Sequence, residues 1–219
     1  MLRRLAAEGL GAALLLAVVV GSGIMAERLS PDSPALALFA NAVATGAGLY
    51  GLITIFGPVS GAHFNPAVTL SAALRGEIDA AAATGYVAVQ TLGAVLGVWG
   101  AHLMFAEPVL QLSTTVRDGA SLAISEFIAT FGLILTIAGT ARTRPEAVAG
   151  AVALYIVAAY WFTASTSFAN PAVTLARALT DTFSGIALTS VPTFIGAQFA
   201  GAVAGVIAGR ALFIQKAAA

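Results

Sequence analysis

The feature that most constrains the fold is a six-residue string that occurs twice. Asn-Pro-Ala-Val-Thr-Leu stands at residues 65–70 and again at 170–175. Looser pairs accompany it, since Tyr86-Val-Ala-Val-Gln90 is echoed by Phe194-Ile-Gly-Ala-Gln198, and a glutamate opens the first apolar run of each copy, at Glu8 and Glu126. Such paired strings indicate an internal duplication, so the two halves are expected to fold alike.

Long apolar runs occupy most of the chain, near 5–26, 35–56, 81–106, 121–140, 147–164 and 186–213. Each is long enough for a membrane helix, which needs about 20 apolar residues. Hydrophobic residues make up 59% of the chain and charged residues 9%, whereas a soluble domain is about half apolar and a quarter charged. This composition excludes a nucleic-acid-binding protein and predicts one domain, 1–219, embedded in a lipid bilayer.

Two shorter apolar segments, 64–74 and 169–179, cannot cross a bilayer. Pro66 and Pro171 suit the first position of a helix, and Asn65 and Asn170 suit the N-cap before it. Both segments are therefore expected to be re-entrant half-helices.

Each copy, about 1–106 and about 119–219, holds three full runs. An odd number of crossings makes the second copy enter from the opposite side, as an inverted repeat that brings the broken helices to the midplane. The predicted fold class is an all-α integral membrane protein with six transmembrane helices and two re-entrant half-helices.

Basic residues set the expected orientation. With the N-terminus in the cytoplasm, seven lie inside (Arg3, Arg4, Arg75, Arg142, Arg144, Arg210 and Lys216) and three outside (Arg28, Arg117 and Arg177). This bias favours both termini in the cytoplasm. A basic pair before an apolar run also fits a signal peptide, but the duplication needs the first run as a span.

Residues 60–69, Ser-Gly-Ala-His-Phe-Asn-Pro-Ala-Val-Thr, together with the second Asn-Pro-Ala at 170–172, resemble the paired NPA motifs of the aquaporin and aquaglyceroporin family. The resemblance covers nearly the whole chain. It implies a passive channel for water and small neutral solutes, without a cofactor, and a homotetramer in which each protomer has its own pore. The similar proteins with unusual filters are bacterial, which implies a bacterial inner (plasma) membrane.

The paired motifs predict a pore midplane made by Asn65, Pro66, Ala67, Asn170, Pro171 and Ala172. Each helix N-terminus carries roughly half a positive charge, and each asparagine amide can donate to a solute oxygen. This arrangement passes neutral hydrogen-bonding solutes and repels cations.

The resemblance also implies an outer selectivity filter of four positions. Counting from the two asparagines places it at Thr45, Ala158, Ser167 and Val173, and the count at Ala158 can slip because loops vary in length. The family almost always has arginine at the last position, where this chain has valine. A wide opening without arginine favours glycerol-like solutes and neutral metalloid hydroxides such as arsenite, with methylated arsenicals as further candidates, and it resembles a bacterial subset linked to arsenic handling.

Four charged or titratable residues near the pore have two possible roles each. Glu8 and Glu126 are expected to accept hydrogen bonds from the re-entrant backbone rather than relay protons. His63 is expected to make a structural hydrogen bond rather than gate the pore. Arg177 is expected to reach the membrane interface or pair with Asp181, although it could instead replace the missing filter arginine at the vestibule. Tyr160, with Tyr50, Trp99 and Trp161, is interpreted as an interface anchor.

Three other functions stay open at this point. They are a narrow water-selective channel, an ion-coupled secondary transporter and a non-conducting membrane scaffold. No catalytic residue is predicted, because the sequence offers no nucleophile with a base and no phosphate loop. No metal site is predicted either, since the chain has two distant histidines and lacks cysteine.

Overall fold

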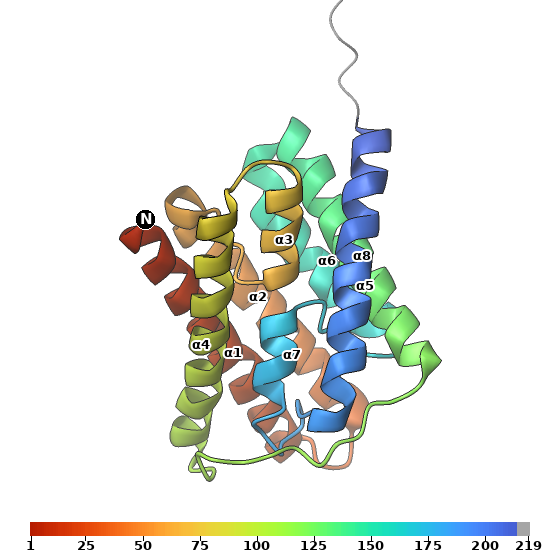
Figure 1. Cartoon of the computed structure of the whole chain (residues 1–219). Helices are drawn as coiled ribbons and strands as arrows, with labels where there is room; N and C mark the ends of the chain where they lie inside the picture. The colour runs from red at the N-terminus through yellow and green to blue at the C-terminus, as the bar shows by residue number, and fades with distance from the viewer. Residues whose placement is uncertain (214–219) are drawn as a thin grey trace, which may run out of the picture.

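The computed structural model describes residues 1–213, and within them it is helical (Figure 1). Its long helices are α1 (Leu2–Leu29), α2 (Pro34–Ser60), α4 (Ala80–Phe105), α5 (Ala120–Thr143), α6 (Val148–Phe162) and α8 (Val191–Leu212). The short elements are α3 (Pro66–Leu74), α7 (Pro171–Arg177), and the 3-10 turns η1 (Pro145–Ala147) and η2 (Leu188–Ser190). Six helical segments of 18 to 28 residues are long and apolar enough to cross a membrane.

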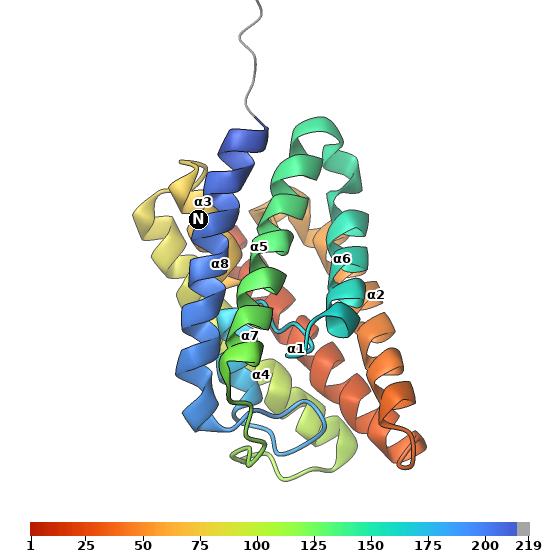
Figure 2. The same cartoon turned by 90° about the vertical axis from the view of Figure 1, so that its right-hand side faces the viewer.

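The two half-helices lie in the centre of the molecule, with α3 above α7 in Figure 1 and the long helices around them. Both begin near the middle of the bundle and run in opposite directions, as an inverted repeat requires. The chain starts and α8 ends on the same side of the bundle (Figure 1, Figure 2). Lys216, one of the residues used for orientation, lies outside the described residues.

The side chains of Asn65 and Asn170 cap the half-helices. Asn65 Oδ1 accepts a hydrogen bond from Ala67 N at 2.8 Å. Asn170 Oδ1 accepts from Ala172 N at 3.0 Å and from Val173 N at 3.2 Å. Since the following prolines have no N–H to satisfy, each cap leaves few unpaired donors where the helix starts inside the bundle.

Helix pairs related by the duplication pack through glycine. Helix α1 lies along α4, and α5 lies along α8 (Figure 1, Figure 2). A Cβ added at Gly93 of α4 would collide with the carbonyl oxygen of Gly9 in α1, and one at Gly201 of α8 would collide with that of Phe127 in α5. The absence of a side chain lets the two backbones approach closely, as is common between membrane helices.

Most of the helix bounds predicted from the sequence lie within a few residues of those in the structure, but the predicted start of the last span is too early. That span was expected from residue 186, whereas α8 begins at Val191. Ile186 and Ala187 are apolar and buried, yet they belong to a loop. Ile186 N donates to Arg177 O at 3.3 Å, and Ala187 N donates to Thr115 O at 2.6 Å.

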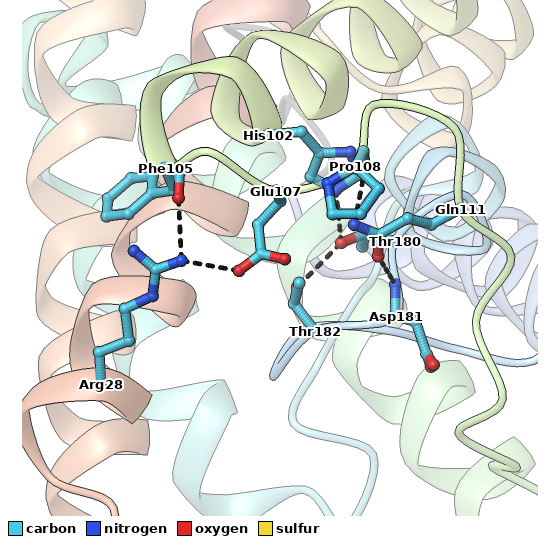
Figure 3. A network of polar contacts seen from close by, with 9 residues as sticks. All are labelled: Arg28, His102, Phe105, Glu107, Pro108, Gln111, Thr180, Asp181 and Thr182. Carbon is cyan, nitrogen blue, oxygen red and sulfur yellow. Dashed lines mark hydrogen bonds and ion pairs between the residues drawn. The ribbon is translucent and has the colours of Figure 1, made fainter.

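A polar network ties this loop to the end of α4 (Figure 3). The buried His102 ring shares a 2.8 Å hydrogen bond with Thr180 Oγ1, and Asp181 N donates to Gln111 Oε1 at 2.8 Å. Nearby, Arg28 pairs with Glu107 at 2.8 Å. These contacts fix the segment that follows α7, and therefore the position of the C-terminal end of α7.

Candidate functional site: a central cavity

A continuous cavity of about 620 Å³ runs through the bundle. At the end of the bundle where α1 begins and α8 ends, its lining includes Arg75, Glu77, Arg142, Arg210 and Phe213. In the middle both capping asparagines line it, and at the far end the lining includes Thr45, Tyr160, Ser167, Val173 and Arg177. The wall between these points is mostly aliphatic.

The asparagine side chains of the two halves are cross-linked by hydrogen bonds. Asn65 Nδ2 donates to Ala169 O at 2.8 Å, and Asn170 Nδ2 donates to Phe64 O at 2.9 Å. An amide nitrogen carries two hydrogens, so one N–H of each asparagine remains for a solute. Both residues are 5% exposed and line the cavity, which places two hydrogen-bond donors beside two positive helix ends. The proline and alanine of each motif, Pro66, Ala67, Pro171 and Ala172, form the first turn of each half-helix.

The backbone before each asparagine is in the left-handed conformation at residues other than glycine. Ala62 and Phe64 have φ of 50° and 48°, and their counterparts Ser167 and Ala169 have 52° and 47°. This region is unfavourable for residues with a Cβ, so it persists only where other contacts hold it. The duplication therefore extends to the backbone conformation.

Glu8 and Glu126 hold these two loops. Glu8 accepts from His63 N at 2.9 Å, Phe64 N at 2.7 Å, Ser60 Oγ at 2.6 Å and Gln90 Nε2 at 2.7 Å. Glu126 accepts from Phe168 N at 2.9 Å, Ala169 N at 2.8 Å and Gln198 Nε2 at 2.6 Å. Both carboxylates are fully buried, and neither lines the cavity.

His63 lines the cavity beside the first loop. Its Nδ1 shares a 3.1 Å hydrogen bond with Thr69 Oγ1, and its ring meets that of Tyr86 edge-on, with the centroids 5.4 Å apart. Thr69 Oγ1 also accepts from Gln90 Nε2 at 3.0 Å. The histidine ring is therefore tied into the hydrogen-bond network around Glu8.

The far end of the cavity corrects one of the four expected filter positions. Ala158 lies on the exposed face of α6 and does not line the cavity, whereas Tyr160 does. The Tyr160 hydroxyl is 3.2 Å from Thr45 Oγ1. Val152, Ile156 and Tyr160 recur at helical spacing along the inner face of α6, so this periodicity, rather than a count across the loop, identifies the inward residue.

The other expected filter residues, Thr45, Ser167 and Val173, line the cavity together with Tyr160. Ser167 Oγ is buried and has no hydrogen-bond partner among residues 1–213. It is therefore an acceptor and donor available at the cavity wall. Val173 stands three residues after Asn170, as Val68 stands three residues after Asn65, and both valines line the cavity.

Arg177 makes neither of the contacts that the sequence suggested. It is 3% exposed, so it does not reach a membrane interface, and Asp181 instead accepts hydrogen bonds from Thr114. The Arg177 guanidinium carbon lies 3.4 Å from the centroid of the Phe168 ring, and Nε donates to Ser184 O. The segment that folds back after α7 covers this side chain.

A second arginine that the sequence analysis did not connect with the cavity contacts the same ring. The guanidinium carbon of Arg117 lies 5.3 Å from the Phe168 centroid, and its Nε donates to Gly185 O at 2.8 Å. Burial lowers the pKa of the Arg117 guanidinium, while the negative charge of Glu126 opposes that shift. The sequence does not indicate the contact between Arg117 and Phe168, because the two residues are far apart in the chain and the loop after α4 brings Arg117 to the ring.

Comparisons with known proteins agree with this architecture. Residues 1–162 match the family described as major intrinsic protein. The chain is 56% identical over 201 residues to the aquaglyceroporin AqpS of Rhizobium meliloti, covering 92% of this chain and 86% of that protein. It is 32% identical over 151 residues to a glycerol uptake facilitator protein of Streptococcus pneumoniae, covering 63% of this chain and 64% of that protein.

Among solved structures, the aquaglyceroporin from Plasmodium falciparum matches with a TM-score of 0.70 and 21% identity, covering 95% of this chain and 94% of that one. At this identity the match concerns the fold, which agrees with the helices described above. The family match over most of the chain and the identity to a full-length relative lead to one conclusion: this chain belongs to the major intrinsic protein family of membrane channels.

Proposed function

We propose that the chain is a passive channel for water and small uncharged solutes, with an outer filter that admits glycerol-like molecules. The observation that carries this proposal is the cavity itself. It offers two asparagine N–H donors at its centre, and Glu77 at one mouth is the sole carboxylate residue in its described lining. Glu77 pairs with Arg75 at 2.7 Å. A neutral solute with hydroxyl groups can accept from the central donors, whereas a cation finds no compensating charge there.

The filter proposed here consists of Thr45, Tyr160, Ser167 and Val173. The phenol ring of Tyr160 and the methyl groups of Val173 give an apolar wall for the carbon atoms of a polyol. The hydroxyls of Thr45 and Ser167 can exchange hydrogen bonds with its oxygens. Arsenite near neutral pH is an uncharged trihydroxide of similar size, so arsenite and methylated arsenicals belong to the proposed solute range.

The oligomer and the setting are also part of the proposal. By its resemblance to aquaporins the protein forms a homotetramer with one pore per protomer. The bacterial relatives in Rhizobium and Streptococcus support a bacterial plasma membrane. The excess of basic residues on the side of the termini supports a cytoplasmic location of both ends.

Two alternatives make different demands on the site. A water-selective channel is favoured by the bulk of Tyr160, which narrows the opening relative to the alanine expected there. An ion-coupled transporter needs an ionisable group at the central site, but Glu8 and Glu126 lie outside the cavity lining and already accept several hydrogen bonds. Uphill accumulation of solute driven by a proton or sodium gradient would favour the transporter.

Stopped-flow light scattering on proteoliposomes tests the proposal. After an osmotic step with glycerol, vesicles that contain a solute channel first shrink and then reswell quickly. Fast reswelling supports the proposed solute range and leads to the same assay with arsenite. Fast water efflux in sucrose without reswelling in glycerol would instead establish a water-selective channel.

Filter substitutions are expected to change glycerol flux in opposite directions. Val173→Arg adds a long side chain to the constriction and should lower glycerol flux about tenfold, with a smaller effect on water. Tyr160→Ala should raise the flux of larger polyols, because it removes a ring from the same constriction. The control is Ala158→Leu, on the exposed face of α6, which should leave both fluxes unchanged. A large change in glycerol flux from Ala158→Leu, with no change from Tyr160→Ala, would show that Ala158 rather than Tyr160 belongs to the filter.

Asn170→Asp is expected to admit cations. The substitution keeps the cap acceptor for Ala172 N and Val173 N, but it places a negative charge where two helix N-termini otherwise repel cations. Potassium and proton fluxes in proteoliposomes under a membrane potential should rise, while Asn170→Gln, a neutral control, should not raise them. Ion fluxes equal to those of the unmodified protein would count against the dipole argument.

A further inference from the structure

Arg177 is a buried positive charge at the far end of the cavity. It is 3% exposed and lines the cavity one helical turn beyond Val173. Within residues 1–213 its hydrogen bond runs from Nε to Ser184 O, and Arg177 takes part in no ion pair there. The buried carboxylate of Glu126 acts on Arg177 only through its charge at longer range.

The partner of this guanidinium is an aromatic ring that it shares with a second cation. Arg177 and Arg117 both contact Phe168, at 3.4 Å and 5.3 Å from the ring centroid. The backbone carbonyls of Ser184 and Gly185 accept from the Nε atoms of the two arginines. A ring face and a carbonyl stabilise a cation but do not cancel its charge. Two guanidinium groups therefore face the charge of one buried carboxylate, Glu126, which leaves an excess of positive charge at this end of the cavity.

We propose that Arg177 is the charge barrier of this channel, which excludes protons and metal cations, while Val173 one turn away sets the width of the opening. The proposal rests on the channel function proposed above. In a filter with arginine in the constriction, one side chain both narrows the opening and charges it. Here the two effects belong to separate residues, so the opening can be wide and still repel cations.

The physical reason is the low dielectric of the wall. A cation that reaches the far end loses hydration and approaches a guanidinium without an ion-pair partner, and the repulsion between like charges is much stronger there than in water. A neutral solute is not repelled in this way, because it carries no net charge. The guanidinium nitrogens other than Nε can also donate to a passing hydroxyl.

The test uses the fact that the chain has no cysteine. In Arg177→Cys, the single thiol is modified after reconstitution, either with a methanethiosulfonate that carries a trimethylammonium group or with neutral methyl methanethiosulfonate. Proton flux is followed with an entrapped pH dye, and glycerol flux by reswelling of the same vesicles. Both samples contain the same folded protein, so they differ in the charge and size of the attached group.

We expect the neutral sample to conduct protons about tenfold faster than the protein that keeps Arg177. The cationic label should lower the proton flux most of the way back to that of the protein with Arg177. Arg177→Gln should leak protons like the neutral sample, and Arg177→Lys should stay tight. Glycerol flux should change little between Arg177→Lys and Arg177→Gln, which separates this proposal from the proposed solute range.

Proton tightness in Arg177→Gln with normal glycerol flux would overturn the proposal. Loss of folded protein in both Arg177→Gln and Arg177→Lys would also overturn it, because Arg177 would then serve to hold the 184–185 turn. Absence of glycerol flux in the unmodified protein would instead contradict the proposed solute range and leave the proton comparison intact.

Discussion

Replacing Gly93 by alanine should strongly destabilise the folded channel, while the same replacement at Gly100 on the same helix should not. A Cβ at Gly93 would collide with the carbonyl oxygen and come within 2.9 Å of the carbonyl carbon of Gly9, and these are backbone atoms of α1 that cannot rotate away. Helices α1 and α4 would have to separate. Overpacking of this kind typically costs about 1–3 kcal/mol and sometimes more.

Gly100 is the matched control because a Cβ there would meet nothing within 4 Å. In a helix interior alanine is favoured over glycine by roughly 0.5–1 kcal/mol, so Gly100→Ala should be neutral or stabilising. The duplication supplies a second pair in α8, where Gly201 abuts Phe127 O and Gly196 meets nothing within 4 Å. Thermal unfolding of the purified protein in detergent should rank the variants accordingly. Equal midpoints for all four would show that these close helix contacts do not limit stability.

Glu126→Gln should abolish most of the correctly folded protein. The carboxylate accepts two backbone N–H groups, of Phe168 and Ala169, and the amide of Gln198. A glutamine amide has one acceptor oxygen, and its NH₂ group would face a donor. Each buried donor left without a partner costs about 1–3 kcal/mol, and the loop with its left-handed residues Ser167 and Ala169 would lose its main support.

The measurement is the yield of monodisperse protein in size-exclusion chromatography, followed by glycerol reswelling of whatever reconstitutes. Glu77→Gln serves as the control, since the Glu77 side chain is 56% exposed at the cavity mouth and its ion pair with Arg75 is of a kind worth little. A proton relay makes the opposite prediction for Glu126→Gln, namely a well-folded protein with altered proton flux. That outcome would remove the scaffold role argued for this carboxylate.

Much of the architecture was predictable because it depends on local patterns. Apolar runs of helical length, prolines at first helical positions and a duplicated string identify six spans and two half-helices. The apolar runs and the prolines act through neighbouring residues, and the duplicated string can be recognised without knowing how the chain folds. The start of α8 could not be read in this way, because Ile186 and Ala187 are as apolar as a membrane helix and only their bonds to Arg177 and Thr115 keep them in a loop.

The outer part of the site was harder to predict because distant segments meet there. Counting twelve residues back from Asn170 passed through a loop of unknown shape and ended at Ala158, which does not line the cavity, whereas Tyr160 does. The contacts expected for Arg177, with the membrane interface or with Asp181, were wrong for a related reason, whereas its expected place at the pore agrees with the cavity lining. The Arg177 side chain contacts Phe168 and Ser184. It is buried because a loop folds back over α7, and the spacing of residues in the sequence does not indicate this fold.

The hydrogen bonds between Asn65 and Ala169 O, and between Asn170 and Phe64 O, have a kinetic consequence. They join the two halves of the chain near the middle of the bundle. In a carrier built from inverted repeats, the two halves would have to move relative to each other at this point. Exchange between outward-facing and inward-facing forms would have to break both of these hydrogen bonds, so we expect one form that stays open to both sides. The flux should then grow in proportion to the concentration difference without saturating, and should depend on temperature about as weakly as diffusion in water does.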